Sequence, residues 1–330
     1  MFDHCARSAA SASSSVAADE LPAIDLLIAA PRGFCAGVRR AIEAAETALR
    51  HHSAPVYVRR PIVHNMAVVR ALEAKGAVFV EELDQVPEGG VVVLSAHGVA
   101  PDIAADAVQR SLISYDAVCP LVAKVHREVE RYSRSGRHVI LVGHEGHPEV
   151  VGTLGHVPTE RASLVASAAE AAALDLPEET PVGIAVQTTY SVEEAADVLQ
   201  VLRARFPNLV EPQASDICYA TTNRQAAVRA IAARADAMIV AGESFSSNAC
   251  RLAEVATAAG CRSVQRIADG SEIDWARLPS RGTIGLTAAA STPDGIIEDI
   301  QERLARRYRV RLEEVKAAEE SVKFKPVVIG

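Results

Sequence analysis

LLIAAPRGFCAGVRRAIEAAETALR, residues 26–50, runs from an apolar strand through a cysteine into a helix. Two related stretches follow it, YDAVCPLVAKVHREVERY at 115–132 and SDICYATTNRQAAVRAIAARA at 215–235. Their cysteines are Cys35, Cys119 and Cys218. The helical parts space apolar residues three and four apart, and Pro120 stands where a first-turn proline belongs. The chain therefore contains a weak internal repeat of roughly 90 to 100 residues.

Each repeat continues with two further strands that end in polar loops. The first set reads VYVRRPIVHN (56–65), HVILVGHEGHPEV (138–150) and DAMIVAGESFSSN (236–248). In this set His64, His147 and Ser246 follow their cysteines by 29, 28 and 28 residues. The second set reads VVVLSAHGV (91–99), VGIAVQTTYS (182–191) and GTIGLTAAAST (282–292). Ligands of parallel sheets sit beyond the carboxyl ends of the strands, so we expect these loops to form a site.

Alternation of strands and helices predicts an α/β fold with parallel sheets. The repeat predicts three small parallel-sheet α/β domains that face one central cavity. We place the domains at residues 21–117, 118–216 and 217–310. A disordered tail at 1–20 and a C-terminal tail at 311–330 complete the division.

Composition excludes several classes of protein. The 330 residues are 49% hydrophobic and only 4% aromatic, and the formal net charge is −8. Without a long Lys/Arg run, we expect no nucleic acid partner. No apolar stretch reaches the roughly 18 residues that a bilayer span needs, and the first twenty residues lack the apolar core of a secretory signal. Six scattered cysteines without a CxxC pair indicate a reducing, cytoplasmic setting.

Three cysteines at equivalent positions, each opening a helix, suggest metal thiolates. A helix N-terminus favours an anion, so we expect depressed thiol pKa values. Iron-sulfur clusters usually take four cysteines, and three would leave one iron open. Zinc with three thiolates and a water is the competing metal. Cys5, Cys250 and Cys261 have no equivalent positions and are interpreted as ordinary small hydrophobic residues.

The polar loops form a donor-rich set suited to a small polyanion. Its members are His64, Asn65, His97, His147, Glu149, Gln187, Thr188, Thr189, Ser246, Ser247, Asn248 and Ser291. No P-loop or GxGxxG element accompanies them, which disfavours a nucleotide. Glu149 is the only carboxylate of the set, so it is a candidate proton shuttle; the alternative is an acid that merely caps a loop.

These segments resemble a known family. PRGFCAGVRRA, IVHN, SAHGV, CPLVAKVH, GHPEV, QTT, DICYATTNRQ, SSN and AST, in this order between about residues 24 and 300, are similar to the 4-hydroxy-3-methylbut-2-enyl diphosphate reductases, also called LytB. The resemblance implies a monomeric trefoil of three α/β domains around a 4Fe-4S cluster. It also implies two-electron reductive dehydroxylation to isopentenyl and dimethylallyl diphosphate, the last step of the non-mevalonate isoprenoid pathway. Reduced ferredoxin or flavodoxin would deliver the electrons.

The resemblance also assigns roles to residues. Cys35, Cys119 and Cys218 match the cluster ligands, leaving one open iron for the substrate's hydroxyl. The catalytic group falls on Glu149, with His147 and Thr188 in support. The substrate contacts fall on His64, His97, His147, Gln187, Thr188, Thr189, Ser246, Ser247, Asn248 and Ser291.

Four positions depart from the usual family pattern, namely Arg60, Phe245, Ala249 and Ala289. Ala289 stands where glycine is common, which would strain the loop if its φ were positive. Two other functions remain open on the residues alone. One is a zinc or mononuclear-metal hydrolase with Glu149 as base, and the other is a non-catalytic iron-sulfur sensor, which the acidic charge balance disfavours.

Overall fold

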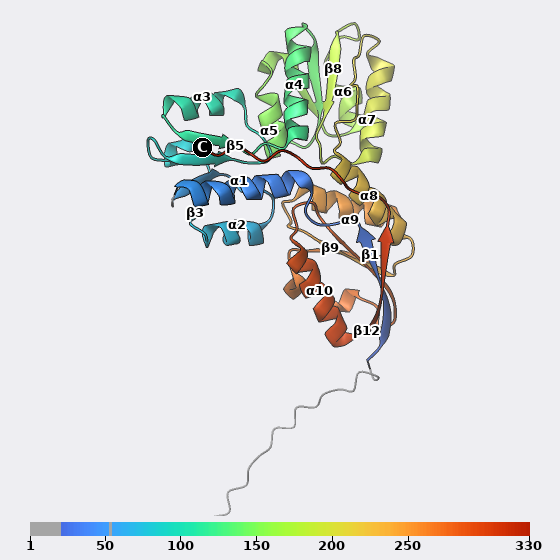
Figure 1. Ribbon diagram of the computed structural model, residues 1–330. Helices are drawn as coiled ribbons and strands as arrows, with labels where there is room; N and C mark the ends of the chain where they lie inside the picture. Colours follow the sequence, from blue (N-terminus) through green and yellow to red (C-terminus); the bar gives the residue numbers. More distant parts are fainter. Residues whose placement is uncertain (1–20, 53–54) are drawn as a thin grey trace, which may run out of the picture.

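The computed structural model describes residues 21–52 and 55–330, and it confirms an α/β fold with three sheets (Figure 1). Every strand pairing within these sheets is parallel across the described ranges. The tail expected at residues 1–20 lies outside the described residues. In the described part of the chain, no helix is both long and apolar enough to cross a membrane.

The first unit has a four-stranded sheet in the order β3-β2-β4-β5. Its strands are β2 (Val56–Arg59), β3 (Ala77–Val80), β4 (Val91–Leu94) and β5 (Ile113–Asp116). Its helices are α1 (Ala36–His52), α2 (Met66–Glu73) and α3 (Pro101–Gln109), with a 3-10 turn at Leu83–Gln85. Helix α1 packs on the sheet through Ala41, Ala44, Ala45 and Ala48, because residues three and four apart share one helix face.

The second unit has a three-stranded sheet in the order β7-β6-β8. Its strands are β6 (His138–Val142), β7 (Ala162–Val165) and β8 (Val182–Val186). Its helices are α4 (Pro120–Arg134), α5 (Pro148–Leu154), α6 (Ala168–Ala173) and α7 (Val192–Arg205), with a 3-10 turn at Thr159–Arg161. Val125, Val129 and Tyr132 of α4 are buried against Val139 and Leu141 of β6.

The third unit has a five-stranded sheet in the order β10-β9-β11-β1-β12. Its strands are β1 (Ala23–Ala30), β9 (Ala237–Ala241), β10 (Val264–Ile267), β11 (Gly282–Ala288) and β12 (Arg309–Lys316). Its helices are α8 (Tyr219–Ala232), α9 (Ser247–Ala258) and α10 (Asp294–Arg307), with 3-10 turns at Gly270–Glu272 and Trp275–Arg277.

The strand at 23–30 corrects the predicted domain limits. We expected it inside a first domain at 21–117, but β1 pairs with β11 and β12 of the third unit. The segment expected to be a tail from residue 311 likewise carries most of β12. Apart from Asp25, strand β1 is apolar on both faces, so its sequence indicates that it is covered on both sides but not which strands flank it.

Each cysteine lies where the chain passes from one unit to the next. Cys35 follows β1 of the third unit and precedes α1 of the first, and Cys119 follows β5 of the first and precedes α4 of the second. Cys218 follows the second unit and precedes α8, which packs on β1 and α9 of the third. This cyclic exchange brings all three cysteines to the junction of the units.

The last fourteen residues cross the junction and end on the first unit, where Figure 1 marks the C-terminus beside β5. Arg40 Nε donates to Lys325 O at 2.9 Å, and Tyr115 Oη donates to Gly330 O at 2.8 Å. Val327 and Ile329 pack against the core of the first unit. The final segment therefore joins the third unit to the first.

This segment also supplies the counter-ion of a buried arginine. Arg224 has a fully buried side chain, and its Nη1 lies 2.8 Å from Glu320 Oε1. We predict that Glu320→Ala lowers the free energy of unfolding by about 3 kcal/mol, because it leaves a buried charge without its partner. Thermal unfolding of the variant checks this. Glu319→Ala, which removes an exposed partner of Lys316, serves as the control and should unfold like the unchanged protein.

Candidate functional site

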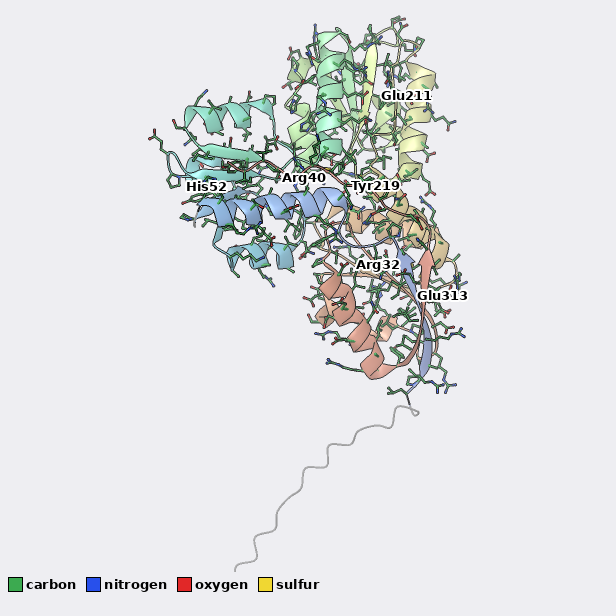
Figure 2. The ribbon with its side chains drawn as sticks, in the orientation of Figure 1. Arg32, Arg40, His52, Glu211, Tyr219 and Glu313 are labelled. Carbon is green, nitrogen blue, oxygen red and sulfur yellow. The ribbon has the colours of Figure 1, made fainter. Side chains whose placement is uncertain are left out.

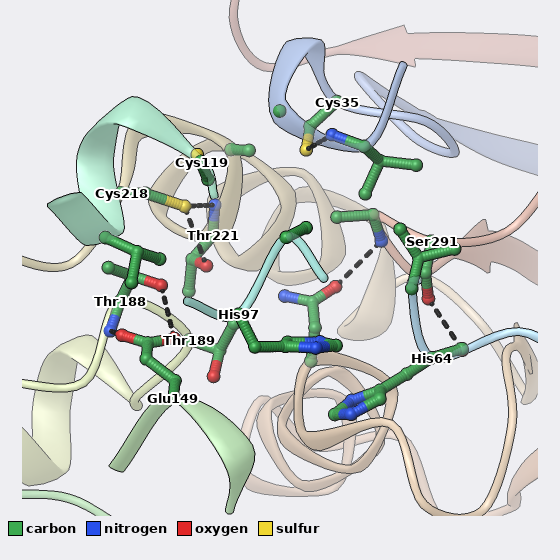
Figure 3. A pocket seen from close by; sticks show the side chains of 18 of the residues that line it. Cys35, His64, His97, Cys119, Glu149, Thr188, Thr189, Cys218, Thr221 and Ser291 are labelled. Atoms are coloured by element: carbon green, nitrogen blue, oxygen red, sulfur yellow. Dashed lines mark hydrogen bonds between the residues drawn. The ribbon is translucent and has the colours of Figure 1, made fainter. Parts of the chain in front are cut away.

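A cavity of about 100 Å³ lies where the three units meet (Figure 3). Its walls carry every site residue expected from the sequence except Gln187 and Asn65, the latter being the buried residue that caps the N-terminus of α2. These residues are Cys35, His64, His97, Cys119, His147, Glu149, Thr188, Thr189, Cys218, Ser246, Ser247, Asn248 and Ser291. Segments separated by more than two hundred residues therefore face one another across a single space.

The three cysteines are anchored in the same way. The backbone N–H of Cys35 donates to Ala290 O at 3.2 Å, that of Cys119 to Ala96 O at 3.0 Å, and that of Cys218 to Thr188 O at 3.0 Å. Each acceptor directly precedes a polar side chain of the second loop set, namely Ser291, His97 and Thr189. The three sequence repeats therefore share the same hydrogen bond between the cysteine backbone and a neighbouring polar loop.

The sulfur atoms accept hydrogen bonds from the helices that they begin. Val38 N donates to Cys35 Sγ, and Thr221 N to Cys218 Sγ, both at 3.4 Å. Gly37 leaves room for them, since a Cβ there would meet Cys119 Sγ at 2.7 Å. Across residues 21–52 and 55–330, no three His, Cys, Asp or Glu side chains are close enough to hold a single metal ion.

The depressed thiol pKa values expected from the sequence are wrong for Cys119 and Cys218. Burial raises the pKa of Cys119 to about 12 and that of Cys218 to about 11, outweighing the backbone hydrogen bonds that would lower them. Cys35 adds to both shifts, because a second thiolate nearby is unfavourable. Helix N-termini alone therefore do not make these two sulfurs thiolates, whereas a bound cationic metal group would.

Three histidines form a neutral cluster on the opposite side of the cavity. The rings of His64 and His97 stack with centroids 4.1 Å apart, and the His147 ring meets that of His64 edge-on at 5.3 Å. Burial lowers the pKa of His64 to about 4 and that of His147 to about 3, and it lowers the pKa of His97 as well. These imidazoles are neutral at pH 7, and an anion between them would favour protonation.

The tautomer of His147 follows from its backbone contact. Its Nδ1 accepts a hydrogen bond from Glu149 N at 3.2 Å, which places the proton of the neutral ring on Nε2. His147 thus retains one N–H donor for a ligand.

Asn248 presents an unpaired donor. Its Oδ1 accepts from Ala290 N at 3.0 Å, which fixes the orientation of the amide. The Nδ2 atom is then buried without a hydrogen-bond partner among the described residues. Buried donors are nearly always paired, so this atom indicates an acceptor supplied by a ligand. Ser291 Oγ donates to His64 O at 3.0 Å, so it connects the loop after β11 to the loop after β2.

Gln187 lies behind the cavity wall. Its Oε1 accepts from His144 N at 3.0 Å, while its Nε2 donates to Thr189 Oγ1 at 2.7 Å and Ser247 Oγ at 3.3 Å. Gln187 therefore holds the lining residues Thr189 and Ser247 in place across the boundary between the second and third units.

Glu149 and Thr188 form a buried pair. Thr188 N donates to Glu149 Oε1 at 2.6 Å, and Thr188 Oγ1 donates to Oε2 at 2.8 Å. Burial raises the pKa of Glu149 to about 7 although both hydrogen bonds oppose the shift, and the nearby Asp216 carboxylate adds to the rise. The side chain can therefore gain and lose a proton near neutral pH, as a general acid must.

None of the four residues that depart from the family pattern lines the cavity. Ala289 does not have positive φ, so the strain considered from the sequence is absent there. Ala249 and Ala289 instead pack closely around Gly242. Arg60 does have positive φ, at 58°, and its Nη2 lies 2.7 Å from Glu82 Oε1. Phe245 is 46% exposed and meets the His64 ring edge-on.

Sequence reasoning missed the rest of the wall, which is apolar or glycine except for Thr221, whose Oγ1 lies 3.3 Å from Cys218 Sγ. The missed residues are Gly37, Val38, Val63, Ala96, Leu121, Val122, Ala220, Thr221 and Ala290. All lie within three residues of a predicted site residue, so proximity in the chain was the available signal.

Comparisons with known proteins agree with this geometry. The family model described as LytB protein matches residues 26–305. A 4-hydroxy-3-methylbut-2-enyl diphosphate reductase of Gluconobacter oxydans (strain 621H) is 48% identical over 304 residues, which cover 91% of this chain and 90% of that protein. The enzyme of the same name from Phenylobacterium zucineum (strain HLK1) is 49% identical over 304 residues, covering 92% and 96%.

Two solved structures share the fold. The E-1-hydroxy-2-methyl-but-2-enyl-4-diphosphate reductase of Plasmodium falciparum superposes with a TM-score of 0.87 at 36% identity, covering 92% of this chain and 96% of that one. A structure titled as (E)-4-hydroxy-3-methyl-but-2-enyl diphosphate reductase, the terminal enzyme of the non-mevalonate pathway, gives 0.60 at 33% identity, covering 85% and 99%. With a family model that matches residues 26–305 and relatives of 48–49% identity over most of the chain, this chain belongs to the LytB protein family.

Proposed function

We propose that this chain is a 4-hydroxy-3-methylbut-2-enyl diphosphate reductase that forms isopentenyl and dimethylallyl diphosphate. One observation carries the proposal. A single cavity is lined by the three cysteines at which the chain passes between units, by many hydrogen-bond donors and by one titratable acid. The relatives and solved structures reported above are named as reductases of this substrate, which gives no support to a hydrolase. We further propose a cytoplasmic monomer that receives electrons from reduced ferredoxin or flavodoxin.

The thiols of Cys35, Cys119 and Cys218 would hold a 4Fe-4S cluster. Soft sulfur donors suit iron-sulfur chemistry, and three thiols around a cavity fit a cluster with one open iron. When bound, such a cluster would supply two electrons, one at a time, and an open site for the substrate's hydroxyl. Gly37 supports this fit, since its missing side chain keeps the space beside Cys119 Sγ free.

The diphosphate would occupy the wall opposite the cysteines. Asn248 Nδ2 offers an unused buried donor there, and the N–H of His147 offers another. His64, His97, Ser246, Ser247 and Ser291 surround the same space. Neutral imidazoles can gain protons beside an anion, so the wall adapts its charge to the diphosphate. Anchoring this end fixes the position of the hydroxyl at the other end of a small substrate.

Glu149 would supply the proton that turns the departing hydroxyl into water. In its protonated form the carboxyl can donate to Thr188 Oγ1, whose own hydrogen then becomes available to the cavity. Thr188 therefore connects a buried acid to the reacting end of the substrate without exposing that acid to solvent.

The cysteine assignment predicts a shared loss. Cys35→Ser, Cys119→Ser and Cys218→Ser should each lose the cluster or nearly all activity, because each removes one ligand. Cys261→Ser should keep both, since Cys261 is buried in the core of the third unit. Iron content and absorption near roughly 400 nm after anaerobic purification measure this. Equal iron content in all four variants would contradict the assignment.

The acid assignment predicts a defect in turnover. Glu149→Gln keeps the shape of the side chain but cannot deliver a proton, so anaerobic turnover should fall by at least ~10²-fold. Cluster content and substrate affinity should remain. Activity of the unchanged enzyme should fall as pH rises through the pKa of about 7, where the acid ionises, and the variant should lack this titration. Glu145→Gln, which changes an exposed acid on the loop before α5, is the control.

The same substitution should stabilise the fold at alkaline pH. A carboxyl whose pKa is raised by folding stabilises the protein at low pH, and this contribution disappears as pH rises through the folded value. For Glu149 the loss between pH 5 and 8 amounts to about 3 kcal/mol, from a pKa of about 7 against an ordinary 4.5. The melting temperature of cluster-free Glu149→Gln should therefore exceed that of the unchanged chain more at pH 8 than at pH 5. An equal difference at both values would contradict the buried acid.

A further inference from the structure

Three cations follow the three cysteines at nearly equal spacing. Arg40 and Lys124 stand five residues after Cys35 and Cys119, and Arg224 stands six residues after Cys218. None of the three side chains lines the cavity. Their hydrogen bonds instead lead away from their own cysteines, and Figure 2 labels Arg40 on α1 and Tyr219 at the start of α8, near this junction.

Arg40 of α1 holds the backbone that leads into Cys119. Its Nη1 donates to Val118 O at 2.8 Å, one residue before the second cysteine. Its Nε donates to Lys325 O at 2.9 Å, so the C-terminal segment fixes the guanidinium from the other side.

Lys124 of α4 holds the backbone that leads into Cys218. Its Nζ donates to Ala214 O at 2.8 Å and to Asp216 Oδ1 at 2.9 Å. The other oxygen of Asp216 accepts from Val186 N at 3.0 Å. The loop before the third cysteine is thereby tied both to α4 and to the end of β8.

Arg224 of α8 holds the backbone that leads into Cys35. Its Nε and Nη2 donate to Gly33 O at 3.1 and 2.7 Å, two residues before the first cysteine. Glu320 pairs with the same guanidinium. Tyr219 Oη accepts from Ala36 N at 3.1 Å, a second contact from α8 to this loop.

The contacts therefore form a closed cycle. The helix after Cys35 holds the backbone before Cys119, the helix after Cys119 holds the backbone before Cys218, and the helix after Cys218 holds the backbone before Cys35. Side chains on a helix lean toward its N-terminus, so a long cation one to two turns into a helix reaches the strand ends beside that terminus. A charged donor on a carbonyl next to a cysteine restricts where its sulfur can lie.

We propose that Arg40, Lys124 and Arg224 are positioning residues that hold the three cysteine sulfurs at the mutual distances required by the cluster. This inference rests on the proposed function, because it presupposes the cluster. The two proposals can nevertheless fail separately, because a chain could bind a cluster through three cysteines whose spacing is set by the sheets alone.

Arg40→Met and Lys124→Met test the proposal in the anaerobically purified, cluster-loaded enzyme. Each keeps a long stem and removes the donors. We expect the rate of iron release to a chelator to rise by roughly tenfold, the equivalent of one charge-assisted hydrogen bond. We also expect a changed electron paramagnetic resonance spectrum of the reduced cluster. Arg40→Lys keeps a donor for Val118 O and should restore much of both properties.

Matched controls separate position from general stability. Arg39→Met and Arg127→Met remove exposed cations on the same helices and should behave like the unchanged enzyme. Glu320→Ala lowers stability but leaves the Arg224 contacts to Gly33 O, so it should retain the normal spectrum. Unchanged iron release and spectra in both Arg40→Met and Lys124→Met would overturn the proposal, as would iron release that merely follows melting temperature across all variants. A colourless unchanged protein would overturn the cluster itself, and this inference with it.

Discussion

The structure depends on one constraint, which is that each cysteine is fixed by its own backbone N–H at the point where the chain changes units. The acceptors Ala96, Thr188 and Ala290 each lie two residues beyond the end of a parallel strand, β4, β8 or β11, and directly before a polar side chain. One hydrogen bond therefore sets the position of a sulfur relative to a ligand-binding loop, and it does so three times. Because the exchange is cyclic, no unit can move without displacing a cysteine that begins the helix of the next one.

The cavity is costly for the folded chain. Glu149 is buried with a raised pKa, three imidazoles are kept neutral, and Asn248 Nδ2 has no partner among the described residues. Burying such groups opposes folding by a few kcal/mol each when they are not fully hydrogen-bonded. The apolar cores of the three units, built from alanine-rich helices on valine- and isoleucine-rich strands, offset this cost. The same unsatisfied groups are those that a diphosphate and a proton transfer would use.

The threefold frame carries a division of chemical roles. Equivalent loops supply two imidazoles in the first unit, a third imidazole and an acid with its threonine in the second, and hydroxyl and amide groups in the third. The first and third units, with His147 of the second, would therefore bind an anion, whereas Glu149 of the second unit would supply a proton. A small substrate that spans the cavity would meet both at once, which a symmetric site could not provide.

Much of this protein could be predicted from the sequence because its signals are local. The strand, cysteine and helix succession, the α/β class and the grouping of polar loops follow from periodicity and from the rule that parallel strands carry their ligands at their carboxyl ends. The partners of β1, the strand at 309–316 and the pKa values of Cys119 and Cys218 did not follow. Strand pairing and burial depend on which surfaces meet in three dimensions, and a one-dimensional pattern does not contain that information. The sequence thus determined which residues approach the site, and only the tertiary structure decided their neighbours, their solvation and therefore their charge.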